Sequence, residues 1–152
     1  MTGPRHAFAI DATDRRIVEA IQTDGRMSLT ALASAVHLGI SATRVRLQAL
    51  EQRGVVSGYT ARVDASALGY PLRAIARLSV DGFQDARVFA ILDEEPRIVR
   101  CSRITGEICF VFEIVAADMA DLERITLRLA ELGTMTTDLV YELLVERAVP
   151  TR

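Results

Sequence analysis

Between Ser28 and Gly54, the apolar positions follow the period of two short α-helices joined by a tight turn. In the first helix they recur every three or four residues and form one stripe, at Leu29, Leu32, Ala33 and Val36. Ser28 precedes the stripe as an expected N-cap, and His37-Leu38-Gly39 forms the turn. Gly54 ends the second helix as a C′ residue. The inward face of that helix carries Thr43, Leu47 and Leu50.

A further helix is expected ahead of this pair, over residues 14–22, with Asp11 or Thr13 as its N-cap. Its apolar stripe consists of Ile17, Val18 and Ile21. Three helices before Val55 are the number that a compact DNA-binding head needs.

After residue 70, the helical period gives way to alternation. The apolar side chains of residues 72–80 fall on one face of an expected strand, at Leu72, Ala74, Ala76, Leu78 and Val80. Further strands are expected over residues 98–104, 107–116 and 136–145, and helices over residues 85–93 and between Asp118 and Gly133. The resulting order, βαββαβ, is the ferredoxin-like arrangement.

The predicted fold class is therefore α+β, with an N-terminal helix-turn-helix (winged-helix-like) domain and a C-terminal ferredoxin-like domain. We expect a flexible arm over residues 1–9, the helix-turn-helix domain over 10–56, an extended linker over 57–70 and the ferredoxin-like domain over 71–152.

The strand expected over residues 107–116 is apolar on both faces. One face carries Ile108, Phe110, Phe112 and Ile114, and the other carries Cys109, Val111 and Val115. Two helices cover only one face of a four-stranded sheet, so the other face must meet a second apolar surface or lie exposed. We expect this surface to be the same sheet of a second copy, in a homodimer with two-fold symmetry that buries Cys109, Val111 and Val115 or the opposite set.

The charge distribution is more informative than the net charge of −2. As far as Tyr70, eight Arg against six acidic residues give +2, and in the remainder ten against fourteen give −4. A mildly basic front and an acidic back suit a DNA-facing domain joined to a domain with another task. No apolar run approaches the roughly 18 residues of a membrane span, and the N-terminus lacks a signal-peptide core, so we expect a cytoplasmic protein.

The helix pair at residues 28–54 is typical of a helix-turn-helix, whose second helix enters the major groove of double-stranded DNA. We expect base contacts from Ser41, Arg44, Val45 and Gln48, and phosphate contacts from Ser28, Thr30, Arg46 and Arg53. The DNA site should be a pseudo-palindromic operator. Two alternatives stay open: a helical hairpin that only buries core, and for Arg46 an ion pair with Glu51 or another acid.

The sequence resembles the Lrp/AsnC family, the feast/famine transcriptional regulators, in motifs that span residues 10–149 in the same order and spacing. In the first half these are Ile10-Asp11, Asp14-Arg15-Arg16-Ile17, Asp24-Gly25-Arg26, Leu32-Ala33, Arg46-Leu47, Leu50-Glu51, Gly54-Val55-Val56, Gly58-Tyr59-Thr60-Ala61 and Leu68-Gly69; in the second half they are Thr105-Gly106-Glu107 and Thr137. The resemblance implies a DNA-binding homodimer, often assembled into octamers, that responds to an amino-acid effector.

The resemblance also implies an effector site formed by Thr105, Gly106, Glu107, Cys109 and Thr137. The family's Gly-x-x-Asp motif reads Gly106-Glu107-Ile108-Cys109 here, so the acid that holds the ammonium group of the ligand is absent. A thiol does not supply that charge near pH 7 unless its pKa is depressed. Glu107 would replace the acid only by turning inward. A second departure is Gly39, where the family usually has a capping Ser.

The main alternative function is a nucleoid-architectural DNA-binding protein of the same fold, with little sequence preference and no ligand. Neither a catalytic set nor zinc-type spacing is recognisable, so no enzyme, cofactor or metal site is predicted. A two-residue turn at Thr105-Gly106 would place Cys101 opposite Phe110 and Cys109 opposite Ser102, with the thiols on opposite faces, which argues against a disulfide.

Overall fold

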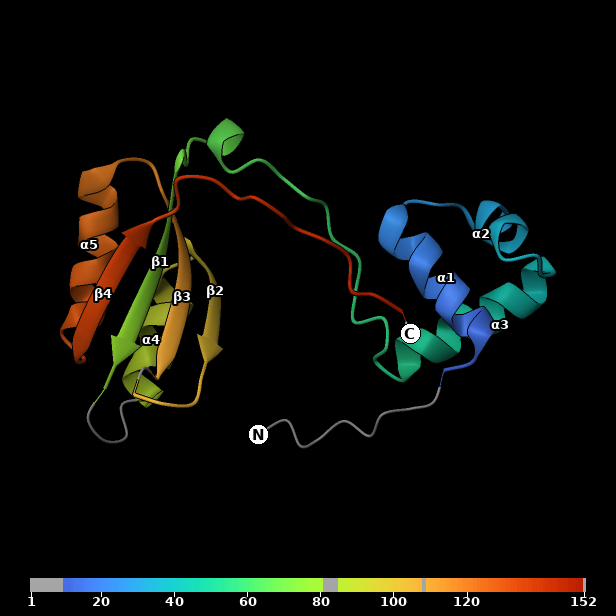
Figure 1. Ribbon diagram of the computed structural model, residues 1–152, viewed down its shortest axis with the longest axis horizontal. Coiled ribbons are helices and arrows are strands. Elements are labelled where there is room, and N and C mark those ends of the chain that lie inside the picture. Colours follow the sequence, from blue (N-terminus) through green and yellow to red (C-terminus); the bar gives the residue numbers. More distant parts are fainter. Residues whose placement is uncertain (1–9, 81–84, 108, 152) are drawn as a thin grey trace. The chain divides into compact units, whose positions relative to one another are not determined.

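The computed structural model describes residues 10–80, 85–107 and 109–151, and the chain divides into two compact units (Figure 1). Among the described residues, the first unit contains residues 10–62 together with residues 145–151, and the second lies within Val63–Leu144. These limits differ from the expected domain limits because the last residues of the chain return to the first unit. The expected arm over residues 1–9 lies outside the described residues.

The first unit contains the three expected helices, α1 (Ala12–Thr23), α2 (Leu29–Ala35) and α3 (Ile40–Gln52). Their inward faces meet in one apolar core, whose fully buried members are Ile17, Leu32, Val36 and Leu50. Because this core is small, the caps at the helix ends and the turns between the helices also help to fix how the three helices are arranged.

Two of the three helix starts have the side-chain caps that the sequence indicates. Asp11 and Asp14 form a reciprocal capping box on α1, and the Ser28 hydroxyl accepts a hydrogen bond from the Ala31 backbone N–H at 3.1 Å on α2. Helix α3 begins at Gly39, which offers no side-chain cap. Gly54 closes α3 with φ +69°, as expected of a C′ residue.

The turn between α2 and α3 is made by His37 rather than by a glycine. His37 has φ +56°, and the next N–H, of Leu38, donates to the Ala33 carbonyl at 3.0 Å. This is the Schellman closure of α2, in which the residue at C′ adopts the left-handed conformation. Gly39 has φ −69° and needs no glycine freedom, so its role is confined to the start of α3.

The second unit is a four-stranded antiparallel sheet with two helices, which confirms the ferredoxin-like prediction. Its strands are β1 (Leu72–Ser79), β2 (Ile98–Arg103), β3 (Phe110–Ala116) and β4 (Thr134–Leu139), in the spatial order β2-β3-β1-β4 (Figure 1). Its helices are α4 (Asp85–Glu94) and α5 (Met119–Ala130), and a short 3₁₀ turn at Ser66–Leu68 precedes the sheet.

Both helices pack on the same face of this sheet. That face is formed by paired positions of β1 and β3: Leu72 with Ala116, Ala74 with Ile114, Ala76 with Phe112, and Leu78 with Phe110. Val88 and Ile91 of α4 and Leu122, Ile125 and Leu129 of α5 complete the core. At the end of α5, a Cβ on Gly133 would overlap the Ser79 carbonyl and lie 3.1 Å from the Val80 Cα, so the close approach of α5 to β1 requires glycine here.

Charged side chains tie the start of α5 to the segment before β2. Glu95 is 2% exposed, and its carboxylate accepts hydrogen bonds from Arg97 at 2.7 and 2.9 Å and from Arg124 at 3.1 Å. Asp121 accepts from the same two guanidinium groups. Burial raises the pKa of Asp121, but the Arg97 guanidinium and the Ala117 backbone N–H outweigh burial and hold this pKa below its usual value. A buried carboxylate with this many partners is satisfied, and removing one partner would be costly.

Two expectations about the strands are wrong. Strand β4 ends at Leu139 instead of 145, because its only partner among the described strands, β1, begins at Leu72, just after Pro71. The two-residue hairpin turn is also wrong: the Ile104 N–H donates to the Cys109 carbonyl, and four residues, 105–108, lie between them.

The longer hairpin shifts the pairing by two residues. Cys101 therefore lies opposite Phe112 instead of Phe110, and Cys109 lies opposite Ile104 instead of Ser102. A shift by two preserves the face of every side chain. Both cysteines are free, as expected. Ile108 itself lies outside the described residues.

None of the helices in the described ranges is long and apolar enough to span a membrane.

Behind α3, the Tyr59 hydroxyl donates a 2.8 Å hydrogen bond to the Glu51 carboxylate. Partial burial of the phenol, followed by this contact with a negative charge, raises the pKa of Tyr59 to about 12. The folded state thus favours the neutral phenol. Because the folded pKa lies above the ordinary value near 10, this contribution to stability is complete below about pH 10 and is lost as the pH rises towards 12.

We expect the ultraviolet difference titration between the wild type and Tyr59→Phe to show one phenol with a midpoint near 12. Glu51→Gln should lower that midpoint only in part, since burial of the phenol, which also raises its pKa, remains. A midpoint near 10 in the wild type would contradict the contact.

Candidate DNA-binding and effector sites

Helix α3 presents the four expected base-contacting residues on one solvent-exposed face. Ser41, Arg44, Val45 and Gln48 are all exposed, and Val45, an apolar residue, is 65% exposed. On the opposite side of the same helix, Thr43 and Leu50 are fully buried. An amphipathic helix is normally polar on its outer side, so a large exposed Val beside Arg and Gln is consistent with a face that meets another molecule.

The residues expected to contact phosphate lie in three different settings. Ser28 and Thr30 are exposed at the start of α2, where the Ser28 hydroxyl is already used as a cap. Arg53 is exposed and ends α3, where its backbone N–H donates to the Ala49 carbonyl at 3.0 Å.

Arg46 is engaged within the protein. Its Nη1 lies 2.6 Å from an Asp11 oxygen and 2.8 Å from an Asp14 oxygen, both at the start of α1. The structure therefore supports the ion-pair alternative for Arg46, with Asp11 and Asp14 in the place of Glu51. The hydrogen bond from the Asp14 backbone N–H, and then the Arg46 guanidinium, hold the pKa of Asp11 below its usual value.

The C-terminal segment is a part of the first unit that the sequence did not predict. The Gln22 side-chain amide exchanges two hydrogen bonds with the Val149 backbone, at 2.9 and 3.0 Å, and Glu19 accepts one from Thr151. Arg62 pairs with Glu146. The segment borders a cavity of about 630 Å³ that α1 and residues 55–60 also line. The only sequence signal was an apolar residue, Val149, followed by Pro150, which is too weak to assign a partner.

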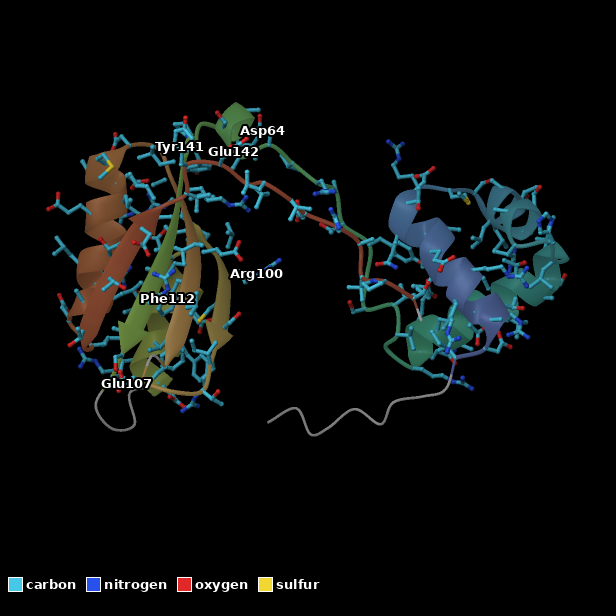
Figure 2. The ribbon with its side chains drawn as sticks, in the orientation of Figure 1. Asp64, Arg100, Glu107, Phe112, Tyr141 and Glu142 are labelled. Carbon is cyan, nitrogen blue, oxygen red and sulfur yellow. The ribbon has the colours of Figure 1, made fainter. Side chains whose placement is uncertain are left out.

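Four of the five expected effector residues lie at one end of the sheet. Glu107 is exposed there, beside the end of β1 (Figure 2), and its backbone carbonyl accepts a hydrogen bond from the Ser79 hydroxyl. Thr105 and Gly106 precede it in the same exposed turn, and Gly106 has φ +112°. The half-buried Cys109 thiol lies 3.9 Å from the Val80 carbonyl.

Thr137 lies elsewhere in the same unit. It pairs with Ala76 in the middle of β1, whereas Ser79, which contacts Glu107, pairs with Thr134. Three residues of strand correspond to about 10 Å. Thr137 instead lines an open cavity of about 830 Å³ between β4 and α5, together with Met119, Ala120, Leu122, Glu123, Thr126, Asp138 and Leu139. One protomer therefore does not bring the five residues together.

The sheet face that α4 and α5 leave uncovered is mixed in character. Ile75 and Val111 lie on it, but Glu113 stands between Arg73 and Arg100 at 3.8 and 3.4 Å. Phe110, Phe112 and Ile114, the opposite set of the sequence prediction, are buried under the helices (Phe112 is labelled in Figure 2). Of the set that contains Val111, Val111 itself is half-buried on the uncovered face, whereas Val115 is already buried within the chain.

Among the described residues, no group of three or more His, Cys, Asp or Glu side chains could hold a metal ion.

Family models match both halves of the chain. The AsnC-type helix-turn-helix domain matches residues 10–51, and the Lrp/AsnC ligand binding domain matches residues 73–150. The HTH-type transcriptional regulator LrpA of Mycobacterium tuberculosis is 32% identical over 130 residues, which cover 85% of this chain and 87% of that protein. The leucine-responsive regulatory protein of Rhizobium meliloti is 32% identical over 117 residues, 75% of each chain.

A solved structure agrees with these relatives. A transcriptional regulator of Neisseria meningitidis, in complex with L-Met, superposes with a TM-score of 0.85 and 25% identity, covering 93% of this chain and 97% of that one. The relatives are transcriptional regulators rather than enzymes, as predicted. The chain belongs to the Lrp/AsnC family of transcriptional regulators and joins a DNA-binding helix-turn-helix domain to a ligand-binding domain.

Proposed function

We propose that this regulator reads the sequence of a pseudo-palindromic operator through α3 and that an amino acid or a related small molecule modulates it. The observation that carries the proposal is the exposed face of α3, where Ser41, Arg44, Val45 and Gln48 lie together on a helix whose other side is buried. Because α3 follows its support helix after a short turn, it has the arrangement that places the start of a helix in the major groove.

The chemistry of this face suits direct base readout. Arg44 can donate two hydrogen bonds to guanine, Gln48 can exchange two with adenine, and Val45 can contact a thymine methyl group. Ser41, near the helix start, can bond either kind of base edge. Thr30, Arg53 and the N-terminal N–H groups of α2 would fix the register on the phosphate backbone, which carries no sequence information itself.

A pseudo-palindromic operator calls for a dimer, and we propose that the uncovered sheet face supplies it. Ile75 and Val111 are apolar positions on that face, and Glu113, which lies opposite Ile75, pairs with Arg73 and Arg100. A two-fold axis through such a face would bring the apolar positions of the two copies together.

For the effector, we propose a site at the turn of residues 105–109. The backbone N–H groups around Gly106, which has φ +112°, are suited to a ligand carboxylate because no Cβ blocks the approach. The Lrp-family acid is replaced by Cys109, and the Glu107 side chain is exposed. A plain amino acid should therefore bind weakly, with Thr137 contributing only where a second protomer brings it near.

Arg44→Ala and Gln48→Ala should each relax the preference at particular operator positions, because each good base contact discriminates by about 1–3 kcal/mol. The measurement is selection of bound duplexes from a randomised library for the wild type and both variants. Arg87→Ala, which removes an exposed Arg from α4, is the control for charge. If both α3 variants kept the wild-type preference, the orientation of α3 would be wrong. A wild type without preference would favour the architectural alternative.

Light scattering at micromolar concentration should give at least twice the chain mass of 16.7 kDa. Val111→Glu should shift the protein towards monomer by adding a charge to the uncovered sheet face. Phe89→Glu, at an exposed apolar position of α4, should leave the mass unchanged. A stable monomeric wild type would refute the dimer.

Cys109→Asp should create or strengthen amino-acid binding, since the missing charge-assisted hydrogen bond corresponds to roughly 1.5–3 kcal/mol, or about ten- to a hundred-fold in affinity. Calorimetry with an amino-acid panel on the wild type and the variant measures this. Cys109→Asn is the control, because the Asn side chain has nearly the same shape as Asp but carries no charge. Tight binding by the wild type that Cys109→Asp leaves unchanged would show that another group, first of all Glu107, holds the ammonium.

A further inference from the structure

Arg46 leaves α3 on the side away from the proposed DNA face. Successive residues of an α-helix are rotated by about 100°, so Ser41, Arg44, Val45 and Gln48 lie within about 50° of one direction. Arg46 lies about 150° from that direction, and only about 40–60° from the fully buried Leu50 and Thr43. A side chain in this position cannot join the others at a base edge.

The partners of Arg46 are arranged as a closed set. Each of the two carboxylates uses one oxygen for the α1 capping box: Asp11 accepts from the Asp14 N–H at 2.8 Å, and Asp14 from the Asp11 N–H at 3.4 Å. Each uses its other oxygen for Arg46 Nη1, at 2.6 and 2.8 Å. We call Arg46, Asp11 and Asp14 the α1–α3 clasp. It joins the first turn of α1 to the middle of α3.

The clasp matters for geometry more than for stability. Exposed ion pairs contribute little to the free energy of unfolding, and the Arg46 and Asp11 side chains are 38% and 53% exposed, whereas the Asp14 side chain is 13% exposed. Apart from the hydrogen bond of Tyr59 to Glu51 near its end, α3 is held largely by apolar contacts with a small core, which tolerate small rotations of a helix better than directed hydrogen bonds do. Base contacts need positions accurate to a fraction of an ångström.

We propose that Arg46 is a positioning residue for base readout, which sets the direction of α3 through Asp11 and Asp14, and not a phosphate contact. This role rests on the proposed sequence-specific function. The positioning role and a phosphate contact predict opposite effects on DNA affinity when the two acids are removed. If the clasp positions α3, removing the two acids harms recognition of the operator just as removing Arg46 does. If Arg46 binds phosphate, removing two negative charges beside it strengthens binding to any DNA.

The test compares the full chain with Arg46→Gln and with the double variant Asp11→Asn/Asp14→Asn. We choose Asn as the replacement because it is a good N-cap residue, so the start of α1 keeps its cap. Affinities are measured for the duplex selected by the wild type and for an unrelated duplex of equal length, over a range of salt concentrations. Circular dichroism fixes a temperature at which every variant is folded. A purely structural role would lower the unfolding temperature without changing the ratio of the two affinities.

We expect both variants to lose about ten-fold in affinity for the selected duplex. Their affinity for the unrelated duplex should stay within two-fold of the wild type, with the same dependence on salt. Arg46→Lys should keep the selectivity, because both contacts come from one nitrogen and an ammonium can make both. If Arg46→Gln does not fold, Arg46→Lys and the double variant Asp11→Asn/Asp14→Asn still test the role.

Three results would overturn the role. In the first, Arg46→Gln weakens both duplexes equally and lowers the salt slope by about 0.9 for each phosphate that Arg46 neutralises, while the Asn pair strengthens both. In the second, neither variant changes the ratio of affinities. In the third, the wild type itself selects no sequence, which refutes the proposed function and this role with it. The first two leave the proposed function standing.

Discussion

The DNA-binding unit depends on one constraint: a very small apolar core must hold α3 with one side buried and one side free. Ile17, Leu32, Val36 and Leu50 provide this core, and their burial decides which residues of α3 face outward. Apolar contacts of this kind are not directional. We therefore infer that polar features at the edges of α3 set its direction, among them the clasp on α1, the left-handed turn before α3 and the hydrogen bond of Tyr59 to Glu51.

The second unit solves a different problem, because its sheet has a helix-covered face and an uncovered one. The pairing of β1 with β3 places large apolar residues such as Phe112 under α4 and α5. The uncovered face keeps Ile75 and Val111 but spaces them with ionic pairs of Glu113. Such a face is compatible with water in a single chain and with a partner in the proposed dimer.

Local sequence signals predicted most of the fold. The three-four spacing of Leu29, Leu32 and Val36 and the alternation of β1 are short-range patterns, and the structure confirms the elements that they indicate. Long-range features were beyond such signals. Arg46 finds its partners 35 and 32 residues away, and Val149 pairs with Gln22 across 127 residues. The prediction of the loop length after β2 was wrong for a local reason. A loop of four residues preserves the same alternation of side chains as a loop of two, so the alternation does not distinguish them.

The separation of Thr137 from the turn of residues 105–109 links the proposed effector site to assembly. About 10 Å of strand divide the two places in one protomer. The ammonium and carboxylate groups of an α-amino acid are attached to a single carbon and cannot bridge that length. If both places contact one effector, a second protomer must bring Thr137 to the turn. The ligand would then bind the assembled form more tightly than the single protomer, and by linkage it would shift assembly by the same free energy.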